Sequence, residues 1–559
     1  MTRKARFSCA ACRRLKRRCP KELPSCTLCA RLKKKCEYPP RALGSYQRLA
    51  DSIVVLDSEN GHVDPDNQSS CRSSSGALDG LRQSPASETP RACDFPVMYF
   101  LDSGTCLKPL SPTQPLCPVA TSASPTPEVQ ALVEEYFSAV HPWLPILSKK
   151  RIRQTFVESG ASEDALHALL LLCMKLLSEP LPPETPAAAT YGYLTAKESL
   201  LRVESSYFPS LALLQSVILI AVYEISHGIY PAAYLRVGHA SRLAIMMGFH
   251  DRKHASQMFK ETSTWTGREE ERRAWWMVFC LERYVNQGIE VLTLCTPEPS
   301  PGELLPSHEA SWDDGAVGFN EPLFASSFSA STSLGAFANM CQAALVLGRV
   351  LRHRDEATAN LALTFRMSEA RQLHFILVSL STHLSSLSES LPHGAGAGAT
   401  TVSLALCSSA RLILYNMYAC NERYSSDHER CSEEADMQKL TLGGIVEVTR
   451  ATGRFARHVL DSMEATTGDA EDGGDDDAVQ NHHYGDGGDG GILSPLVAHS
   501  LYEAATECEW FILEQQDSDA VVWLRDIVKL LRVMARRWQV AGVYLSQIYK
   551  WPGYKNVLS

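Results

Sequence analysis

Six cysteines lie close together near the N-terminal end of the chain, and the residues between them are mostly lysine and arginine. Their spacing is C-x2-C-x6-C-x6-C-x2-C-x6-C, and its two halves, CAACRRLKRRC and CTLCARLKKKC, repeat one another. Each half begins with C-x-x-C, a spacing that lets two thiolates face one metal ion across a helical turn. The six residues are Cys9, Cys12, Cys19, Cys26, Cys29 and Cys36.

The number of cysteines predicts the number of metal ions. A structural zinc ion takes four ligands in a tetrahedron, so six thiolates are too many for one ion. Two ions need eight contacts, which six thiolates supply if two of them bridge the pair, and no histidine lies in the segment to complete two separate sites. Two alternatives remain at this point: a disulfide framework, which is typical of small secreted domains, and a redox or metal-buffering segment, which would not need the basic residues.

The segment resembles the binuclear zinc cluster of a family of fungal transcription regulators. Every cysteine spacing of that family is present, together with Arg13 and Lys16 after the second cysteine and Pro24 two residues before the fourth. The resemblance implies two zinc ions per chain, with Cys9 and Cys26 bridging them. It also implies a DNA-binding domain, which we assign to residues 1–45.

The basic residues of this domain are then expected to contact duplex DNA. A segment so short has almost no apolar core, so zinc must supply its folding free energy, about 10–16 kcal/mol per ion in finger peptides. Lys and Arg gain affinity for DNA by releasing its counterions, and modules of this kind place a helix in the major groove. The resemblance implies that Lys16, and next Arg17, contact base edges. The residues expected either to contact phosphates or to be merely solvated are Arg13, Arg14, Arg18, Lys33, Lys34 and Lys35.

The charge of the chain is divided unevenly. Residues 1–41 contain fourteen Lys and Arg against Glu22 and Glu37, a net charge of +12. The whole chain has a net charge of −9, so the remainder carries −21. A basic end on an acidic body is typical of a protein that binds a polyanion. A zinc-knuckle RNA-binding protein stays open as an alternative, although RNA modules usually stack bases on aromatic side chains and none lies between Cys9 and Cys36.

The elements that must position this domain follow it. After a short linker, apolar residues fall at the alternating three- and four-residue spacing of a coiled coil, which predicts a dimerisation segment over residues 46–60. Because the pattern covers only about two heptads, an ordinary amphipathic turn remains an alternative. Residues 61–125 are rich in Ser, Pro and Gly and predict a disordered linker. The residues of the predicted dimer seam are Tyr46, Leu49, Ile53 and Leu56.

The body of the chain has helical periodicity and no convincing β-alternation. In LALLQSVILIAVYEI, at 211–225, apolar residues form one wide face with a period of 3.6. The order of YFSAVHPWLPIL, LLQSVILIAVYEISHG, GHASRLAIMMGFH and RRAWWMVFCLERY resembles the fungal-specific transcription factor domain. We therefore expect a mainly α protein: a small zinc-cluster domain and a large all-α regulatory domain over 126–455, joined by a disordered linker. Trp275 and Trp276 are expected in its core, with an effector pocket as the alternative.

Two segments complete the chain. Residues 456–491 are rich in Gly and Asp and predict a disordered acidic loop. Residues 492–559 are expected to form helices that pack on the regulatory domain, with contact to the transcription machinery as the alternative. No run of about 18 residues is judged apolar enough to span a bilayer, and the nearest candidate is 211–223. No signal peptide is recognised, so the twelve other cysteines are expected to be reduced, intracellular thiols.

The sequence shows no catalytic signature, since G-x-S-x-G, a Walker loop and H-E-x-x-H are all missing, and we do not expect an enzyme. The function implied by the resemblance is a sequence-specific regulator of RNA polymerase II transcription. It would act in the nucleus as a homodimer that reads CGG-like half-sites in double-stranded DNA and contacts the transcription machinery or co-regulators. Regulation of one biosynthetic gene cluster is a further hypothesis, and any small-molecule effector is left open.

Overall fold

The computed structural model describes part of the chain. The described residues are 24–31, 35–36, 127–158, 164–182, 185–206, 208–290, 292–324, 334–356, 363–390, 397–419, 432–468, 493–551 and 554. They belong to two compact units, Met1–Ser87 and Glu88–Ser559. Within the described ranges all regular structure is helical, apart from one isolated bridge between Leu304 and Pro322, and the expected all-α fold class is confirmed.

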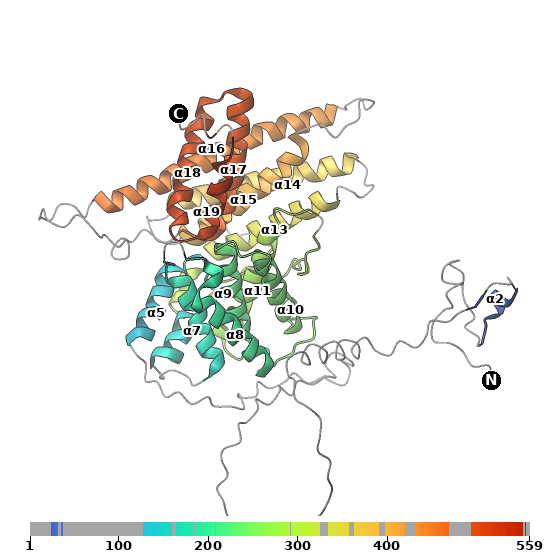
Figure 1. Cartoon of the computed structure of the whole chain (residues 1–559), viewed down its shortest axis with the longest axis vertical. Helices are drawn as coiled ribbons and strands as arrows, with labels where there is room; N and C mark the ends of the chain where they lie inside the picture. Colours follow the sequence, from blue (N-terminus) through green and yellow to red (C-terminus); the bar gives the residue numbers. More distant parts are fainter. Residues whose placement is uncertain are drawn as a thin grey trace, which may run out of the picture. The chain divides into compact units, whose positions relative to one another are not determined.

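The first helices of the larger unit surround one buried helix, α9 (Leu211–Ser226). Helices α7, α10 and α11 pack against it, and α8 also contacts it (Figure 1). The helices of this part are α5 (Pro127–Ala139), α6 (Lys149–Ile152), η1 (Arg153–Glu158), α7 (Ala165–Ser178), η2 (Ala187–Ala189), α8 (Tyr191–Ser206), α10 (Ala232–Met246) and α11 (Trp265–Val285).

Helix α9 is buried on all sides, whereas the sequence predicted a single apolar face. It begins where the Ser210 hydroxyl accepts a hydrogen bond from the amide of Leu213, and it ends before Gly228, whose φ of 66° favours glycine. Every residue from Leu213 to Ser226 is buried. Its polar side chains are tolerated because they are hydrogen-bonded: for example, the Gln215 amide donates to the Ile146 carbonyl at 3.0 Å.

The remaining helices form the second part of the larger unit, around α15 (Ala397–Ala419). Helices α13, α14, α16 and α17 all pack against α15 (Figure 1). The helices of this part are α13 (Ala336–Asp355), α14 (Leu363–Ser390), α16 (Ser432–Gly468), η4 (Pro495–Val497), α17 (Ala498–Gln515), α18 (Ser518–Ala535) and α19 (Gln539–Ile548). The short helix α12 (Glu309–Asp313) lies between α11 and α13 in the chain and contacts the first part, where Asp313 pairs with His141.

Helix α15 contradicts the expectation that no run of about 18 residues is apolar enough to span a bilayer. Its residues Gly398–Ala419 reach a mean hydropathy of 1.2 and are long enough to cross a bilayer, a candidate that the sequence analysis missed. However, 72% of this window is buried inside the protein by the surrounding helices. The helix is therefore apolar because it is the core of its own part of the fold.

Helix α16 corrects the predicted boundary at residue 455. It continues to Gly468, so residues 456–468 are helical and the predicted loop over 456–491 begins too early. Beyond residue 455 the helix still contacts α18, because Arg457 forms an ion pair with Asp526 at 2.7 Å. Residues 469–491 lie outside the described residues.

The C-terminal helices pack onto the first part of the same unit. Trp538 makes an edge-to-face contact with Trp143 at 6.1 Å between ring centroids. The Gln539 side chain accepts from the amide of Ala187 at 3.1 Å and donates to the Thr185 carbonyl at 2.7 Å. Aromatic packing and satisfied polar contacts thus join residues far apart in the sequence.

We predict that Leu214→Asp lowers the free energy of unfolding by more than about 3 kcal/mol, because Leu214 is fully buried in α9 and the new carboxylate would have no partner. Urea denaturation of the full chain measures this. The matched control is Leu235→Asp on α10, where the side chain is 64% exposed and the change should cost less than about 0.5 kcal/mol. Equal losses in the two variants would contradict the placement of α9 in the core.

Candidate metal centre

Three cysteines of the first unit meet around the short helix α2 (Thr27–Arg31). Their sulfur atoms all lie within 4.8 Å of one another. Cys26 directly precedes the helix and Cys29 lies within it, so the C-x-x-C spacing brings both side chains to one side, and Cys36 returns to close the group. Cys26 and Cys29 are buried and Cys36 is half-buried.

Backbone amide groups point at two of these sulfur atoms. The amide of Cys26 donates to the Cys36 sulfur at 3.3 Å, and that of Cys29 donates to the Cys26 sulfur at 3.4 Å. Hydrogen bonds of this kind favour the charged form of a ligand and fix its orientation. In a tetrahedral zinc site with Zn–S bonds of about 2.3 Å, two sulfur atoms lie about 3.8 Å apart. The three side chains therefore fit ligands of one zinc ion.

Most of the other predicted site residues lie outside the described part of the chain. Lys35, the residue before Cys36, is described and is exposed. Arg31, the last residue of α2, is exposed as well. The predicted residues outside the description are Cys9, Cys12, Cys19, Arg13, Arg14, Lys16, Arg17, Arg18, Lys33, Lys34, Tyr46, Leu49, Ile53 and Leu56.

Buried cysteines of the larger unit have a different chemistry. Burial raises the pKa of the Cys407 thiol to about 12, and it raises the pKa of Cys173 and Cys508 as well. A thiol that stays protonated is a poor nucleophile and a poor metal ligand. Among the described residues, the group around α2 is the one set of three or more Cys, His, Asp or Glu with its ligand atoms this close together.

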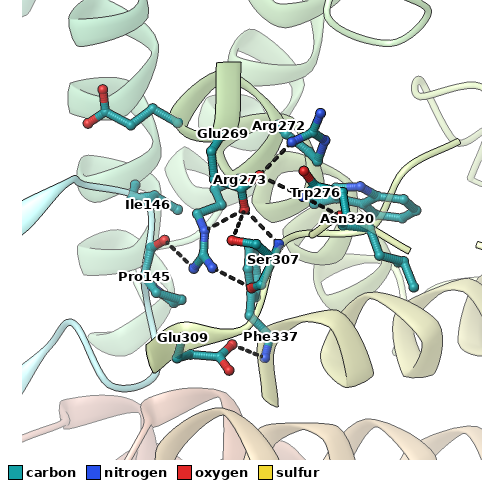
Figure 2. A network of polar contacts seen from close by, with 12 residues as sticks. Pro145, Ile146, Glu269, Arg272, Arg273, Trp276, Ser307, Glu309, Asn320 and Phe337 are labelled. Atoms are coloured by element: carbon teal, nitrogen blue, oxygen red, sulfur yellow. Dashed lines mark hydrogen bonds and ion pairs between the residues drawn. The ribbon is translucent and has the colours of Figure 1, made fainter. Parts of the chain in front are cut away.

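The larger unit contains a buried polar network at the start of α11, which the sequence analysis did not identify. Figure 2 shows its centre, the fully buried guanidinium of Arg273. It donates to Glu269 at 3.0 Å, to the Pro145 carbonyl at 3.2 Å and to the Ser307 carbonyl at 2.7 Å. One side chain therefore joins three separate segments of the chain. The signal in the sequence was the charged run EEERR directly before the apolar run AWWMVFCL.

The carboxylate of Glu269 is ionised despite its burial. It accepts hydrogen bonds from the amide of Ser307 and from the side chain of Asn320, both at 2.8 Å, and it pairs with Arg272 at 2.5 Å (Figure 2). Burial alone would raise the pKa of this carboxyl, but the charges of Arg273 and Arg272 and these hydrogen bonds outweigh burial and lower the pKa below its usual 4.5.

The two tryptophans of α11 belong to the core, as expected. Trp275 and Trp276 are both buried, and the Trp276 indole donates to the Leu304 carbonyl at 2.9 Å. A third tryptophan, Trp312, contacts the network: the central carbon of the Arg273 guanidinium lies over its ring, 4.6 Å from the ring centroid. Aromatic faces and carbonyl oxygens thus replace the water contacts that this cation loses on burial.

Comparison with known proteins agrees with both units. Residues 7–45 match the fungal Zn(2)-Cys(6) binuclear cluster domain, and residues 133–288 match the fungal specific transcription factor domain. Transcription factor BOA15 of Botryotinia fuckeliana is 36% identical over 146 residues, which cover 26% of this chain and 80% of that protein.

Two more distant relatives have names that state a pathway. The azaphilone cluster-specific transcription factor azaR of Aspergillus niger is 26% identical over 299 residues, 50% of this chain and 62% of that protein. The pigment biosynthesis transcriptional activator pigB of Monascus ruber is 25% identical over 179 residues, 29% of this chain and 32% of that protein.

A cysteine-rich zinc module combined with an all-α body defines a DNA-binding transcription regulator. The chain belongs to the fungal Zn(2)-Cys(6) transcription factors, whose cluster domain binds two zinc ions through six cysteines.

We predict that Arg273→Met lowers the free energy of unfolding by about 3–5 kcal/mol at neutral pH, because Glu269 keeps its burial but loses its main partner. The folded-state pKa of Glu269 lies below 4.5, so its contribution to stability is present above that pH and is lost as the pH falls through the folded-state value. The difference between variant and parent should therefore shrink on acidification.

The measurement is urea denaturation between about pH 3 and 7. The matched control is Arg153→Met, which removes an exposed ion pair with Glu134 and should cost less than about 1 kcal/mol. A difference between parent and Arg273→Met that stays constant with pH would show that the pair does not carry the effect.

Proposed function

We propose that this protein is a sequence-specific regulator of RNA polymerase II transcription that acts in the nucleus on one biosynthetic gene cluster. The observation that carries the proposal is the group of Cys26, Cys29 and Cys36 within a segment that matches the cluster domain of fungal transcription factors. The pathway-level part is supported by the names of the relatives, which include an azaphilone cluster-specific factor and a pigment biosynthesis activator.

The proposed zinc ligands are all six cysteines of residues 9–36, with Cys9 and Cys26 each shared by both ions. When bound, zinc supplies the folding free energy that a domain of this size cannot obtain from an apolar core. Cys26 suits a shared position because it is fully buried and its sulfur accepts the amide hydrogen of Cys29. The cysteine side chains then hold the two halves of the segment in fixed positions.

The basic residues between the cysteines are proposed to bind duplex DNA. Lys16, with Arg17 next, would donate to the O6 and N7 acceptors of guanine in CGG-like half-sites. Arg13, Arg14, Arg18, Lys33, Lys34 and Lys35 would contact phosphates. A single helix reads roughly three base pairs, too few to select among about 10⁶–10⁹ competing sites. Two chains joined through Tyr46, Leu49, Ile53 and Leu56 would double the length that is read.

We predict two zinc ions per chain by elemental analysis, and loss of both from Cys26→Ser, because a shared ligand serves both ions. The matched control is Cys295→Ser: Cys295 is an exposed cysteine of the larger unit, so this variant should retain two ions. One ion in the parent, or two in Cys26→Ser, would contradict the shared-ligand arrangement.

For DNA, we predict that Lys16→Ala weakens binding by roughly 1–3 kcal/mol and relaxes discrimination at one guanine. Lys34→Ala should instead weaken binding to all sequences alike and reduce the slope of log K against log salt by about one unit. Affinities of the full chain for duplexes with one or two CGG half-sites, measured at several salt concentrations, distinguish the two roles.

The same assay includes single-stranded RNA as a competitor. RNA that displaces duplex DNA at equal nucleotide concentration would favour the zinc-knuckle alternative.

Replacing both Leu49 and Ile53 with Glu should abolish the preference for paired half-sites and leave binding to one half-site unchanged. If that preference survives, residues 46–60 are not the dimer contact.

A further inference from the structure

Helix α18 carries a row of basic side chains on its exposed face. The residues of the row are four, three and four positions apart, so they lie on one side of the helix over a length of roughly 16 Å. All of them are exposed, whereas the opposite face of α18 is buried against α16, α17 and α19. We name this set the α18 basic row: Arg525, Lys529, Arg532 and Arg536.

Several other basic side chains of the larger unit are paired with carboxylates. Arg349 and Arg352 of α13, for example, both contact Glu298. Arg525 and Lys529 of the α18 basic row, by contrast, have no ion-pair partner within the described residues. Their positive charge is therefore available to an anion that the described residues do not supply.

Arg532 is fixed in place without being neutralised. Its guanidinium donates to the phenol oxygens of Tyr549 and Tyr554, both at 2.9 Å. Neutral acceptors of this kind hold the side chain but leave its charge uncompensated. Because like charges three or four residues apart repel one another on a helix, an anion that lies along the α18 basic row would relieve this repulsion.

Residues 469–492, which we name the acidic segment, have the charge that complements this row. They contain seven Asp, one Glu and no Lys or Arg, a net charge of −8 with His neutral. The acidic segment lies outside the described residues, but the residues on both sides of it are described. The charge of the segment comes from the sequence and the position of its two ends comes from the structure.

Both ends of the acidic segment lie at elements that contact α18 or its C-terminal end. The preceding helix, α16, packs on α18, where Arg457 pairs with Asp526 at 2.7 Å (Figure 1). The residue that follows, Leu493, accepts a hydrogen bond through its carbonyl from the Trp538 indole at 2.9 Å. Trp538 lies two residues beyond Arg536, the last member of the row. A chain of 24 residues extends to about 80 Å at most, so its length permits it to lie along the row.

We propose that the acidic segment docks on the α18 basic row of the same chain. Its carboxylates pair with the exposed cations Arg525, Lys529 and Arg536. Exposed ion pairs are individually weak and are screened by salt, so the contact depends on the short tether, which gives an effective concentration on the order of 1 mM. The docking is therefore reversible and is lost at high salt.

The α18 basic row is favoured over the other strongly basic part of the chain because its tether is shorter. Residues 1–41 have a net charge of +12, but the 90 residues from 37 to 126 separate their last cysteine from the first described residue of the larger unit. Effective concentration falls as a tether lengthens. A free polyanion such as DNA would have to displace the tethered segment, so docking also shields the row from nucleic acid phosphates.

The experiment is carbodiimide cross-linking of the zinc-loaded full chain without DNA, followed by mass spectrometry. Carbodiimide joins a carboxylate to a lysine amine in direct contact, and Lys529 is the one lysine of the row. We expect links from Lys529 to the acidic segment at a yield at least about fivefold above that of the exposed Lys253, which follows α10. Salt at about 0.5 M should abolish them. A mixture of isotope-labelled and unlabelled chains distinguishes links within one chain from links between two.

Charge reversal of the row tests whether its cations hold the segment. Arg525→Glu/Arg536→Glu leaves Lys529 in place and should lower its cross-link yield at least about fivefold. The matched control, Lys175→Glu/Arg202→Glu, changes the net charge equally at side chains that are 52% and 76% exposed on α7 and α8. It should leave the yield within about twofold of the parent. Urea denaturation shows whether each variant is folded.

A second variant leaves every described helix unchanged. Asp475→Asn/Asp476→Asn/Asp477→Asn removes three charges of the acidic segment, and it should lower the yield of links between Lys529 and the remaining carboxylates of the segment. This variant decides the question if the reversal of the row impairs folding.

Four results overturn the proposal. These are a yield at Lys529 no higher than at Lys253, links that join two chains, links from the acidic segment chiefly to lysines of residues 1–41, and yields that neither variant lowers more than the control does. Because the assay contains no DNA, its result is independent of sequence recognition and of the proposed function.

Discussion

The close approach of three cysteine sulfur atoms is the physical constraint on which the DNA-binding part of the protein depends. Cys26, Cys29 and Cys36 place their sulfurs within 4.8 Å of one another in a segment with very little apolar surface. Six thiolates alone would carry a charge of −6, and two zinc ions reduce this to −2, so metal binding and folding are one process. The basic residues between the cysteines can then be held in fixed positions without a conventional core.

The larger unit differs from the zinc-binding segment because it has an extensive apolar core. Charged side chains are buried within that core. Arg273 and Glu269 lie fully buried, and each satisfies its hydrogen-bonding groups through segments remote in sequence. Such a pair contributes less to net stability than an apolar pair of the same size would, but removing one partner is costly. The network therefore fixes how α11 packs against the segments around residues 145 and 307.

The sequence predicted the elements with a strong period and missed features that depend on tertiary partners. Helix α9 was recognisable because its apolar residues recur every three or four positions. The complete burial of α9 was not, since Glu224 reads as a solvent-facing residue until Tyr193 is seen to donate to it at 2.8 Å. The C-terminal limit of α16 was also misplaced, because its packing on α18 extends the helix into a polar stretch.

The same difference between locally determined features and features that depend on tertiary partners applies to the functional and polar sites. The spacing of the cysteines predicted that Cys26, Cys29 and Cys36 would meet, because zinc coordination depends on residue type and on distance along a short segment. The Arg273 network was not predictable in this way, since Pro145, Ser307 and Asn320 have no periodic pattern that links them to α11. Local chemistry is therefore readable from the sequence, whereas a buried polar network requires the fold.

We infer that this chain reads duplex DNA through its zinc cluster. The most direct measurement is selection of bound sequences by the zinc-loaded full chain from a random duplex DNA pool, with a random single-stranded RNA pool in parallel. The expected result is enrichment of paired CGG-like triplets from the duplex pool, loss of that enrichment when zinc is chelated, and no enriched motif from RNA. Enrichment from RNA alone, or an enriched DNA motif that survives removal of zinc, would contradict it.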